Sequence, residues 1–207
     1  MITEPEIDKY LHDLVPARDE VLTEMEALAA RKKICIVGPA VATFLSLLVT
    51  MSGARRIFEL GSAIGYSTIW LARAAGPGAE IHYSDGSAEN AMLAQEFFTR
   101  AGVASRIHVH VGDALTALAN TPGDFDMLFN DVDKEGYPEV LKVAPSRLKS
   151  GGLFVTDNTL WHGRVLHPQS DEDHGVATFN QRLAQSKDFR LTSLLPLRDG
   201  VSVSVRR

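Results

Sequence analysis

In Phe58-Glu59-Leu60-Gly61-Ser62-Ala63-Ile64-Gly65-Tyr66-Ser67, the chain passes from an apolar strand to a helix through one tight turn, and this passage is the best indicator of its fold. Glycines in such a turn let the backbone approach a ligand closely, and the free N–H groups that begin a helix can donate to that ligand. A dinucleotide-binding loop reads Gly-x-Gly-x-x-Gly, but here Ala63 fills the middle position and Gly65 comes one residue early. The spacing therefore favours an adenosyl ligand with an amino-acid tail, and a plain strand–helix turn is the alternative.

Short apolar runs alternate with longer amphipathic runs around and beyond this stretch. The predicted strands are residues 57–60, 81–84, 107–111, 125–130 and 153–156, and the predicted helices are 66–75, 87–101, 114–119, a segment ending near 149, and 176–186. Residues 189–195 and 201–205, with a turn at Asp199-Gly200, are typical of a hairpin. The alternation predicts an α/β fold: a Rossmann-like, doubly wound, mostly parallel seven-stranded sheet with helices on both faces and a C-terminal antiparallel hairpin. Ligands of such sheets bind at the carboxyl ends of the strands.

Three further helices are predicted ahead of the first strand. Thr3 and Glu6 have capping-box spacing for the first helix, a second follows Pro16, and a third covers about residues 40–51. We therefore expect a single domain over residues 1–207, with N-terminal helices in 1–52 and an α/β core in 53–207.

Composition narrows the class of protein. The 207 residues are 45% hydrophobic and 23% charged, as in one globular domain that needs no metal or disulfide for stability. The net charge of −5 argues against a general nucleic-acid-binding protein, and the single Cys35 excludes an internal disulfide or a cysteine-built zinc site. The acidic first residues do not match a signal peptide, and the apolar run 37–51 is too short to span a bilayer. We expect a cytoplasmic protein with no nucleic-acid or membrane partner.

Acidic residues follow the next two predicted strands. Asp85 ends the second strand, where a carboxylate can accept hydrogen bonds from the ribose hydroxyls of an adenosine. It could equally serve as a turn residue or helix cap at Asp85-Gly86-Ser87. Asp113 and Ala114, after the third strand, are candidates to line the adenine, and Asp113 could instead cap the next helix.

The sharpest signal comes from the ends of the fourth and fifth strands. Asp131 follows the fourth strand, and Asp157-Asn158 follows the fifth, so these side chains converge if the two strands are neighbours. Three oxygen ligands without cysteine suit Mg²⁺, Mn²⁺ or Ca²⁺ rather than zinc, and two vicinal hydroxyls of a substrate could chelate such an ion. Lys134, three residues after Asp131, is then a candidate general base. The alternative is that each acid caps a helix.

Two groups of aromatic side chains could have either a functional role or an ordinary role in packing. Trp161 and His162 could form a wall of an acceptor pocket, and Trp161 could equally be packing. His108 and His110 alternate on one strand without further ligands at metal spacing, so we expect them to pack or to contact solvent.

Taken together, three motifs resemble the cation-dependent O-methyltransferases, which include catechol and caffeoyl-coenzyme A O-methyltransferases and their small bacterial relatives. The motifs are Glu59-Leu60-Gly61-x-x-x-Gly65-Tyr66-Ser67, Asp131-x-Asp133-Lys134, and Asp157-Asn158-x-Leu160-Trp161-x-Gly163-Arg164-Val165. The resemblance covers about residues 35–207 and includes the closing Leu195-Pro196-x-x-Asp199-Gly200. It implies S-adenosylmethionine and a divalent cation, normally Mg²⁺, as cofactors, and a homodimer.

The resemblance also implies a role for each matching residue. The cofactor-binding residues would be Val37, Glu59, Gly61, Ser67, Asp85, Asp113, Ala114 and Asp131. Asp131, Asp157 and Asn158 would hold the metal, Lys134 would take the proton from the acceptor hydroxyl, and Trp161 would contact the substrate.

We therefore expect methyl transfer from S-adenosylmethionine to a hydroxyl of a small catechol-like acceptor. Ser193 stands where the mammalian catechol enzyme has an acidic residue, so a strict catechol preference does not follow. The alternatives are a non-catechol hydroxyl, such as that of a sugar or antibiotic precursor, a nicotinamide-dependent oxidoreductase, and a non-catalytic S-adenosylmethionine-binding module.

Overall fold

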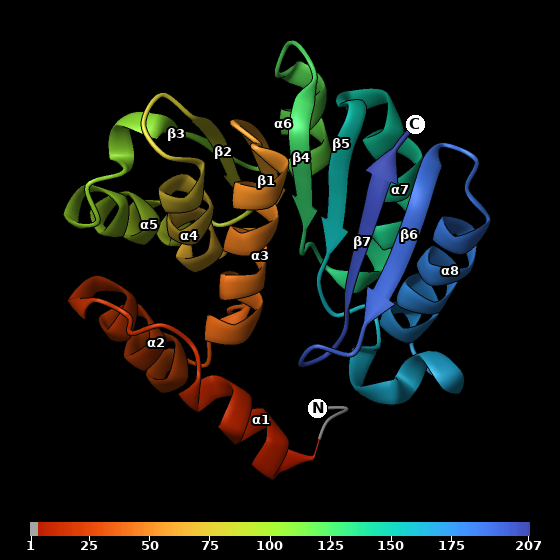
Figure 1. The fold of residues 1–207 in the computed structure, drawn as a ribbon, viewed down its shortest axis with the longest axis horizontal. Helices are drawn as coiled ribbons and strands as arrows, with labels where there is room; N and C mark the ends of the chain where they lie inside the picture. The colour runs from red at the N-terminus through yellow and green to blue at the C-terminus, as the bar shows by residue number, and fades with distance from the viewer. Residues whose placement is uncertain (1–3) are drawn as a thin grey trace.

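A computed structural model describes residues 4–207 and contains the predicted seven-stranded sheet (Figure 1). The strands are β1 (Arg56–Leu60), β2 (Glu80–Asp85), β3 (Ile107–Val111), β4 (Phe125–Asn130), β5 (Leu148–Thr156), β6 (Phe189–Leu195) and β7 (Val201–Arg206). Their order is β3-β2-β1-β4-β5-β7-β6, with β1 to β5 parallel. β7 runs antiparallel to both β5 and β6. The Rossmann-like class and the C-terminal antiparallel hairpin are confirmed.

Helices cover both faces of this sheet. They are α1 (Pro5–Asp13), α2 (Glu20–Lys32), α3 (Gly38–Ser52), α4 (Tyr66–Ala75), α5 (Ala88–Arg100), α6 (Ala114–Asn120), α7 (Tyr137–Val143) and α8 (Asp171–Gln185). Neighbouring strand residues point to opposite faces, so Ile57 packs with α2 to α5 whereas Phe58 packs with α6 to α8. Each face thus has its own hydrophobic cluster. Figure 1 shows α1 extending away from the sheet, and Tyr10 on this helix is exposed.

The order of the strands reverses between β1 and β4. From β1 the chain builds outward to β2 and β3, and then returns to place β4 on the other side of β1. Leu60 and Asn130 pair at the carboxyl ends of these two strands. This switch point is where an open α/β sheet leaves room for a ligand, so the fold places the predicted site at one edge.

The helix predicted to end near residue 149 is wrong in its extent. α7 ends at Val143, a 3₁₀ turn follows over Ala144–Arg147, and β5 begins at Leu148. Pro145 explains the early end, because its ring has no N–H for the helix and restricts the residue before it. β5 is consequently longer than predicted, and Leu148 pairs with Phe125 of β4.

Two other helix boundaries depend on caps. α8 begins at Asp171 rather than at Val176, because Ser170 and Asp173 form a reciprocal capping box. The predicted cap at Thr3 lies outside the described residues, and α1 begins at Pro5 with Glu4 as its N-cap. Among helices of residues 4–207, none has the length and apolar character required to cross a membrane.

Candidate active site

A cavity of about 920 Å³ opens at the carboxyl ends of the parallel strands. One part of its lining comes from the loops after β1, β2 and β3, including Gly61 and Asp85. Another part comes from the loops after β4 and β5, including Asp131 and Asp157. Both predicted sites therefore belong to a single cavity.

The glycines of the loop after β1 are required by close contacts. Gly61 has φ +80°, and a Cβ on it would lie 2.5 Å from the carbonyl oxygen of Asp131. Gly65 has φ +81°, and a Cβ there would lie 2.5 Å from the Phe98 ring. A side chain at either position would push the loop away from its neighbours; Gly61 keeps the loop against the end of β4, and Gly65 keeps it against α5.

Glu59 and Ser67 support this loop from behind the cavity wall. The buried Glu59 carboxylate accepts hydrogen bonds from the hydroxyls of Ser67 and Thr68 at the start of α4. Burial raises the pKa of Glu59 to about 7, although these hydroxyls oppose the rise. Glu59 and Ser67 do not line the cavity, and neither does the buried Val37 that precedes α3. Direct contact of these three predicted residues with a cofactor stays a prediction.

Asp85 was predicted either to bind a ribose or to stabilise a turn, and its position in the structure is compatible with both roles. One carboxylate oxygen accepts from the backbone N–H of Ala63 at 2.9 Å, and the other accepts from Ser87 N at 2.9 Å and Asn90 Nδ2 at 3.0 Å. Asp85 also lines the cavity. It is thus a turn residue whose carboxylate is held rigidly where a ribose could reach it, and carboxylate oxygens have further acceptor capacity.

Asp113 and Ala114 likewise lie on the cavity wall. Asp113 caps α6 by accepting from Thr116 N at 2.7 Å, so the capping alternative holds for this residue. The cap positions Ala114 at the first turn of a helix beside the loop after β2.

Asp131, Asp157 and Asn158 meet at the ends of β4 and β5, as the strand order requires. The Asp157 N–H donates to Asn130 O at 3.1 Å, and the Asp131 N–H donates to Leu60 O at 2.8 Å, so the two loops leave the sheet side by side. All three side chains line the cavity. Asn158 has φ +55°, a left-handed conformation that asparagine adopts more readily than most residues.

The chemistry of this donor set fits a divalent cation. Asp157 is buried, and its Oδ1 atom has no hydrogen-bond partner in residues 4–207. Burial and the nearby Asp131 carboxylate raise the pKa of Asp157 to about 7, and burial also raises the pKa of Asp131 against the opposing Lys134. A cation would relieve this repulsion. The described chain has no group of three His, Cys, Asp or Glu side chains placed to hold a metal, so this set depends on the Asn158 amide.

Lys134 lies beside these carboxylates. Its Nζ atom is 2.8 Å from Asp131 Oδ1 and 3.1 Å from Val132 O, and it lies 5.5 Å from the centre of the Trp161 ring. The Lys134–Gly136 turn packs tightly against α8, because a Cβ on Gly175 would lie 2.8 Å from Glu135 Cα. Gly175 therefore lets α8 fix the backbone from which Lys134 projects.

The loop after β5 is held by the hairpin turn. The Asp199 carboxylate accepts from His162 N at 2.5 Å, and the Asp199 carbonyl accepts from Leu160 N at 2.9 Å. Trp161 lines the cavity, and its indole N–H donates to Asp173 Oδ1 at 3.0 Å, so it is both a wall residue and a packing residue.

Sequence reasoning did not assign roles to Gly175, Arg198 and Asp199. A glycine near the start of an amphipathic helix was a usable signal for Gly175, since it weakens the helix unless packing requires it. Asp199 was assigned only to the hairpin turn, and its contact with the Leu160–His162 segment could not be predicted because the two are far apart in the sequence. Arg198 lines the cavity from the same turn, and nothing local in the sequence marked it.

Comparison with known proteins agrees with this geometry. A family model described as O-methyltransferase matches residues 13–207. A catechol O-methyltransferase of Niastella koreensis is 34% identical over 201 residues, which cover 91% of this chain and 89% of that protein. A catechol O-methyltransferase of Mycobacterium tuberculosis is 35% identical over 172 residues, covering 82% and 78% respectively. The crystal structure of an O-methyltransferase from Bacillus cereus in complex with SAH has a TM-score of 0.89 at 29% identity and covers both chains completely.

The fold and the site define the class of methyltransferases with a Rossmann-like sheet. The chain belongs to the O-methyltransferase family, and it is an S-adenosylmethionine-dependent O-methyltransferase. Membership of this family sets aside the nicotinamide-dependent oxidoreductase and the non-catalytic binding module.

Proposed function

We propose that this enzyme transfers the methyl group of S-adenosylmethionine to one of two adjacent hydroxyls of a catechol-like acceptor, with Mg²⁺ bound by Asp131, Asp157 and Asn158. The observation that carries the proposal is the buried, unpartnered Oδ1 of Asp157 beside the Asp131 carboxylate. These groups share one cavity with the Gly61 loop and Asp85. The curated relatives named catechol O-methyltransferase support the choice of acceptor.

The cofactor would occupy the part of the cavity formed by the loops after β1, β2 and β3. The glycine loop gives its backbone close access, and Asp85 would accept hydrogen bonds from the ribose hydroxyls. Asp113 and Ala114 would border the adenine. Glu59 and Ser67 would hold the loop from behind, by the hydrogen bonds that fix the start of α4.

Lys134 would accept the proton of the acceptor hydroxyl at its Nζ atom. The acceptor oxygen then forms a bond to the methyl carbon as the carbon–sulfur bond breaks, leaving a thioether and a protonated Lys134. When bound, the cation supplies Lewis acidity that favours loss of the hydroxyl proton. Asp131, next to Nζ, would stabilise the ammonium form, and Trp161 would help keep water from the reacting atoms. Positioning the two reactants in one cavity would account for much of the rate.

The test is methyl transfer from labelled S-adenosylmethionine to a panel of vicinal diphenols, with Mg²⁺ and with EDTA. We expect turnover that is lost in EDTA and restored by Mg²⁺. Turnover that persists in EDTA would contradict the metal assignment, and binding of S-adenosylmethionine without turnover of any diphenol would contradict the acceptor class.

A non-catechol hydroxyl is the second candidate acceptor. A solved O-methyltransferase from Streptomyces achromogenes involved in tomaymycin synthesis has a TM-score of 0.87 at 29% identity, and it covers 97% of this chain. Adding monohydroxylated aromatic acceptors to the panel separates the two, because they lack the second hydroxyl needed to chelate a metal. The homodimer and the cytoplasmic location implied by the resemblance and the composition stay predictions, which light scattering and cell fractionation would test.

A further inference from the structure

Arg198 occupies an unusual position in the turn between β6 and β7. Its φ of +54° lies in the left-handed region, which an arginine adopts only when the surrounding structure imposes it. The side chain is half-buried and lines the same cavity as Asp131, Asp157 and Trp161. An imposed backbone conformation that delivers a charged side chain to a ligand cavity calls for a functional explanation.

The guanidinium is anchored at one end. Its Nη1 atom donates to Ile36 O at 2.8 Å, in the segment that leads into α3. A Cβ on Gly38 would lie 3.3 Å from the same atom, so the absence of a side chain at Gly38 leaves room for the guanidinium. The contact joins the C-terminal hairpin to the N-terminal helices across the rim of the cavity.

Charge makes Arg198 distinctive within the cavity. The lining contains many carboxylates, whereas Lys134 and Arg198 are its only lysine or arginine side chains within residues 4–207. Lys134 is already paired with Asp131 at 2.8 Å. Across the described part of the chain, no carboxylate lies within ion-pairing distance of Arg198, although its charge helps to lower the pKa values of Asp131 and Asp157. A guanidinium has five N–H donors, so most of them remain available to a ligand.

We propose that Arg198 binds a carboxylate group of a ligand in this cavity and thereby selects vicinal dihydroxy aromatic acids over uncharged diphenols as acceptors. The inference rests on the proposed function for the choice of acceptor. A planar guanidinium is the side chain best matched to a carboxylate, and charged hydrogen bonds of this kind are about twice as strong as neutral ones. The aminocarboxylate end of S-adenosylmethionine offers the same chemistry, and the experiment separates the two sources.

The experiment compares Arg198→Gln and Arg198→Gly with Arg190→Gln. Arg190 lies exposed on β6 and does not line the cavity, so its replacement makes the same change in net charge without touching the site. Arg198→Gly suits the left-handed backbone and guards against misfolding, which thermal unfolding checks. Calorimetry would measure binding of S-adenosylhomocysteine alone, of S-adenosylmethionine alone, and of 3,4-dihydroxybenzoate and catechol to the Mg²⁺- and S-adenosylhomocysteine-loaded protein.

We expect both Arg198 variants to bind 3,4-dihydroxybenzoate roughly 10-fold more weakly or worse, with catechol affinity unchanged and Arg190→Gln like the parent protein. Weaker binding of S-adenosylmethionine with an unchanged preference between the two acceptors would assign the carboxylate to the cofactor and overturn acceptor selection. Unchanged binding of all ligands would overturn the inference and leave Arg198 as a structural link to Ile36. Absence of methyl transfer to an acceptor that does bind would contradict the proposed function alone.

Discussion

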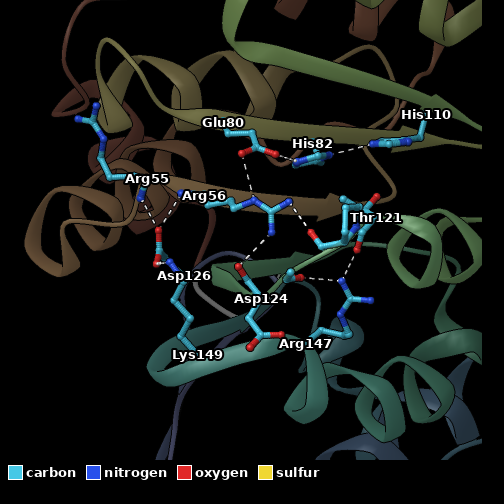
Figure 2. A network of polar contacts seen from close by, with 12 residues as sticks. Arg55, Arg56, Glu80, His82, His110, Thr121, Asp124, Asp126, Arg147 and Lys149 are labelled. Atoms are coloured by element: carbon cyan, nitrogen blue, oxygen red, sulfur yellow. Dashed lines mark hydrogen bonds and ion pairs between the residues drawn. The ribbon is translucent and has the colours of Figure 1, made fainter.

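Carboxylates lie at both ends of the sheet, and the two ends differ in whether every carboxylate oxygen has a hydrogen-bond partner. At the amino ends of the strands, Figure 2 shows a network in which the Arg56 side chain donates to Glu80 at 3.1 Å and Asp126 accepts from Lys149 at 2.6 Å. At the carboxyl ends, the Asp157 Oδ1 atom has no hydrogen-bond partner in residues 4–207. The carboxylates of this amino-end network are therefore structural, whereas Asp157 at the other end has an oxygen available for a ligand.

The pKa values follow this division. Arg56 and His82 hold the pKa of Glu80 at about 2, and Lys149 with two backbone N–H groups keeps the pKa of Asp126 below its ordinary value despite partial burial. Burial and Asp131 raise the pKa of Asp157 to about 7. A carboxylate in a cavity is a candidate functional group when its surroundings destabilise its negative charge and so raise its pKa.

Asp157→Ala should produce the largest difference between the two ends. Removing a proposed metal ligand should lower turnover by roughly 10³-fold, because the cation supplies several kcal/mol of charge stabilisation. Without added metal the variant should be no less stable than the parent, since this removes a buried carboxylate whose Oδ1 has no hydrogen-bond partner in residues 4–207. Turnover in Mg²⁺ and urea unfolding in EDTA measure these effects. Undiminished Mg²⁺-dependent turnover would remove Asp157 from the site.

Lys134→Ala should lower kcat by roughly 10²-fold while S-adenosylmethionine still binds, because a positioned general base is lost. Single-turnover transfer and calorimetric binding provide the two readouts. Lys142→Ala is the matched control, since Lys142 is exposed and pairs with Glu139 on α7. A kcat equal to that of the parent enzyme would show that another group takes the proton.

The sequence was sufficient to predict that Asp131 and Asp157 meet, and insufficient to find the residues that support them. Asp131 and Asp157 follow recognisable strands, and parallel strands bring their carboxyl ends together, so their meeting was predictable. The contact of Gly175 with Glu135 and that of Arg198 with Ile36 join segments far apart in the chain. Such contacts depend on how the hairpin and the helices pack, so they cannot be predicted from the local pattern of apolar residues.

The same limit explains the predictions that the structure changed. The segment before Leu148 is apolar enough for a helix, but Pro145 ends it and strand pairing takes over. Glu59 and Ser67 were predicted as cofactor contacts from the motif alone, and that contact stays a prediction; their side chains bond to each other, and neither residue lines the cavity. A motif identifies which residues cooperate, whereas packing decides which of them face the ligand.

Asp126→Ala tests the satisfied end of the sheet. Asp126 accepts from the backbone N–H groups of Arg55 at 2.9 Å and Arg56 at 2.8 Å, so its loss leaves two donors without their partner. We expect about 2–3 kcal/mol of lost unfolding free energy in urea, with turnover per folded molecule unchanged. Asp124→Ala is the control, since Asp124 is exposed and joins this network through its backbone carbonyl, which accepts from Arg56 Nη1 at 3.1 Å. A selective loss of turnover would show that the two ends are coupled.

A pH-dependent effect, absent at neutral pH, should come from His82 within the same network. His82 is buried between Glu80 at 2.7 Å and His110 at 2.9 Å, and burial lowers its pKa from 6.5 to about 4 even though Glu80 opposes the change. Between pH 6.5 and 4 the unfolded chain therefore binds a proton that the folded chain resists, so this group makes stability fall as the pH falls through that window.

Replacing His82 with Gln should flatten the pH dependence of the unfolding free energy by at most about 1.4 kcal/mol per pH unit between these limits. Glu80 affects stability at lower pH, because its lowered pKa means that its stabilising effect disappears only as the pH falls from 4.5 towards 2. Urea unfolding at a series of pH values separates the two, with His174→Gln as control because His174 is exposed on α8. An unchanged slope in His82→Gln would mean that another group governs acid sensitivity, and the contrast between the two ends would then rest on the carboxylates alone.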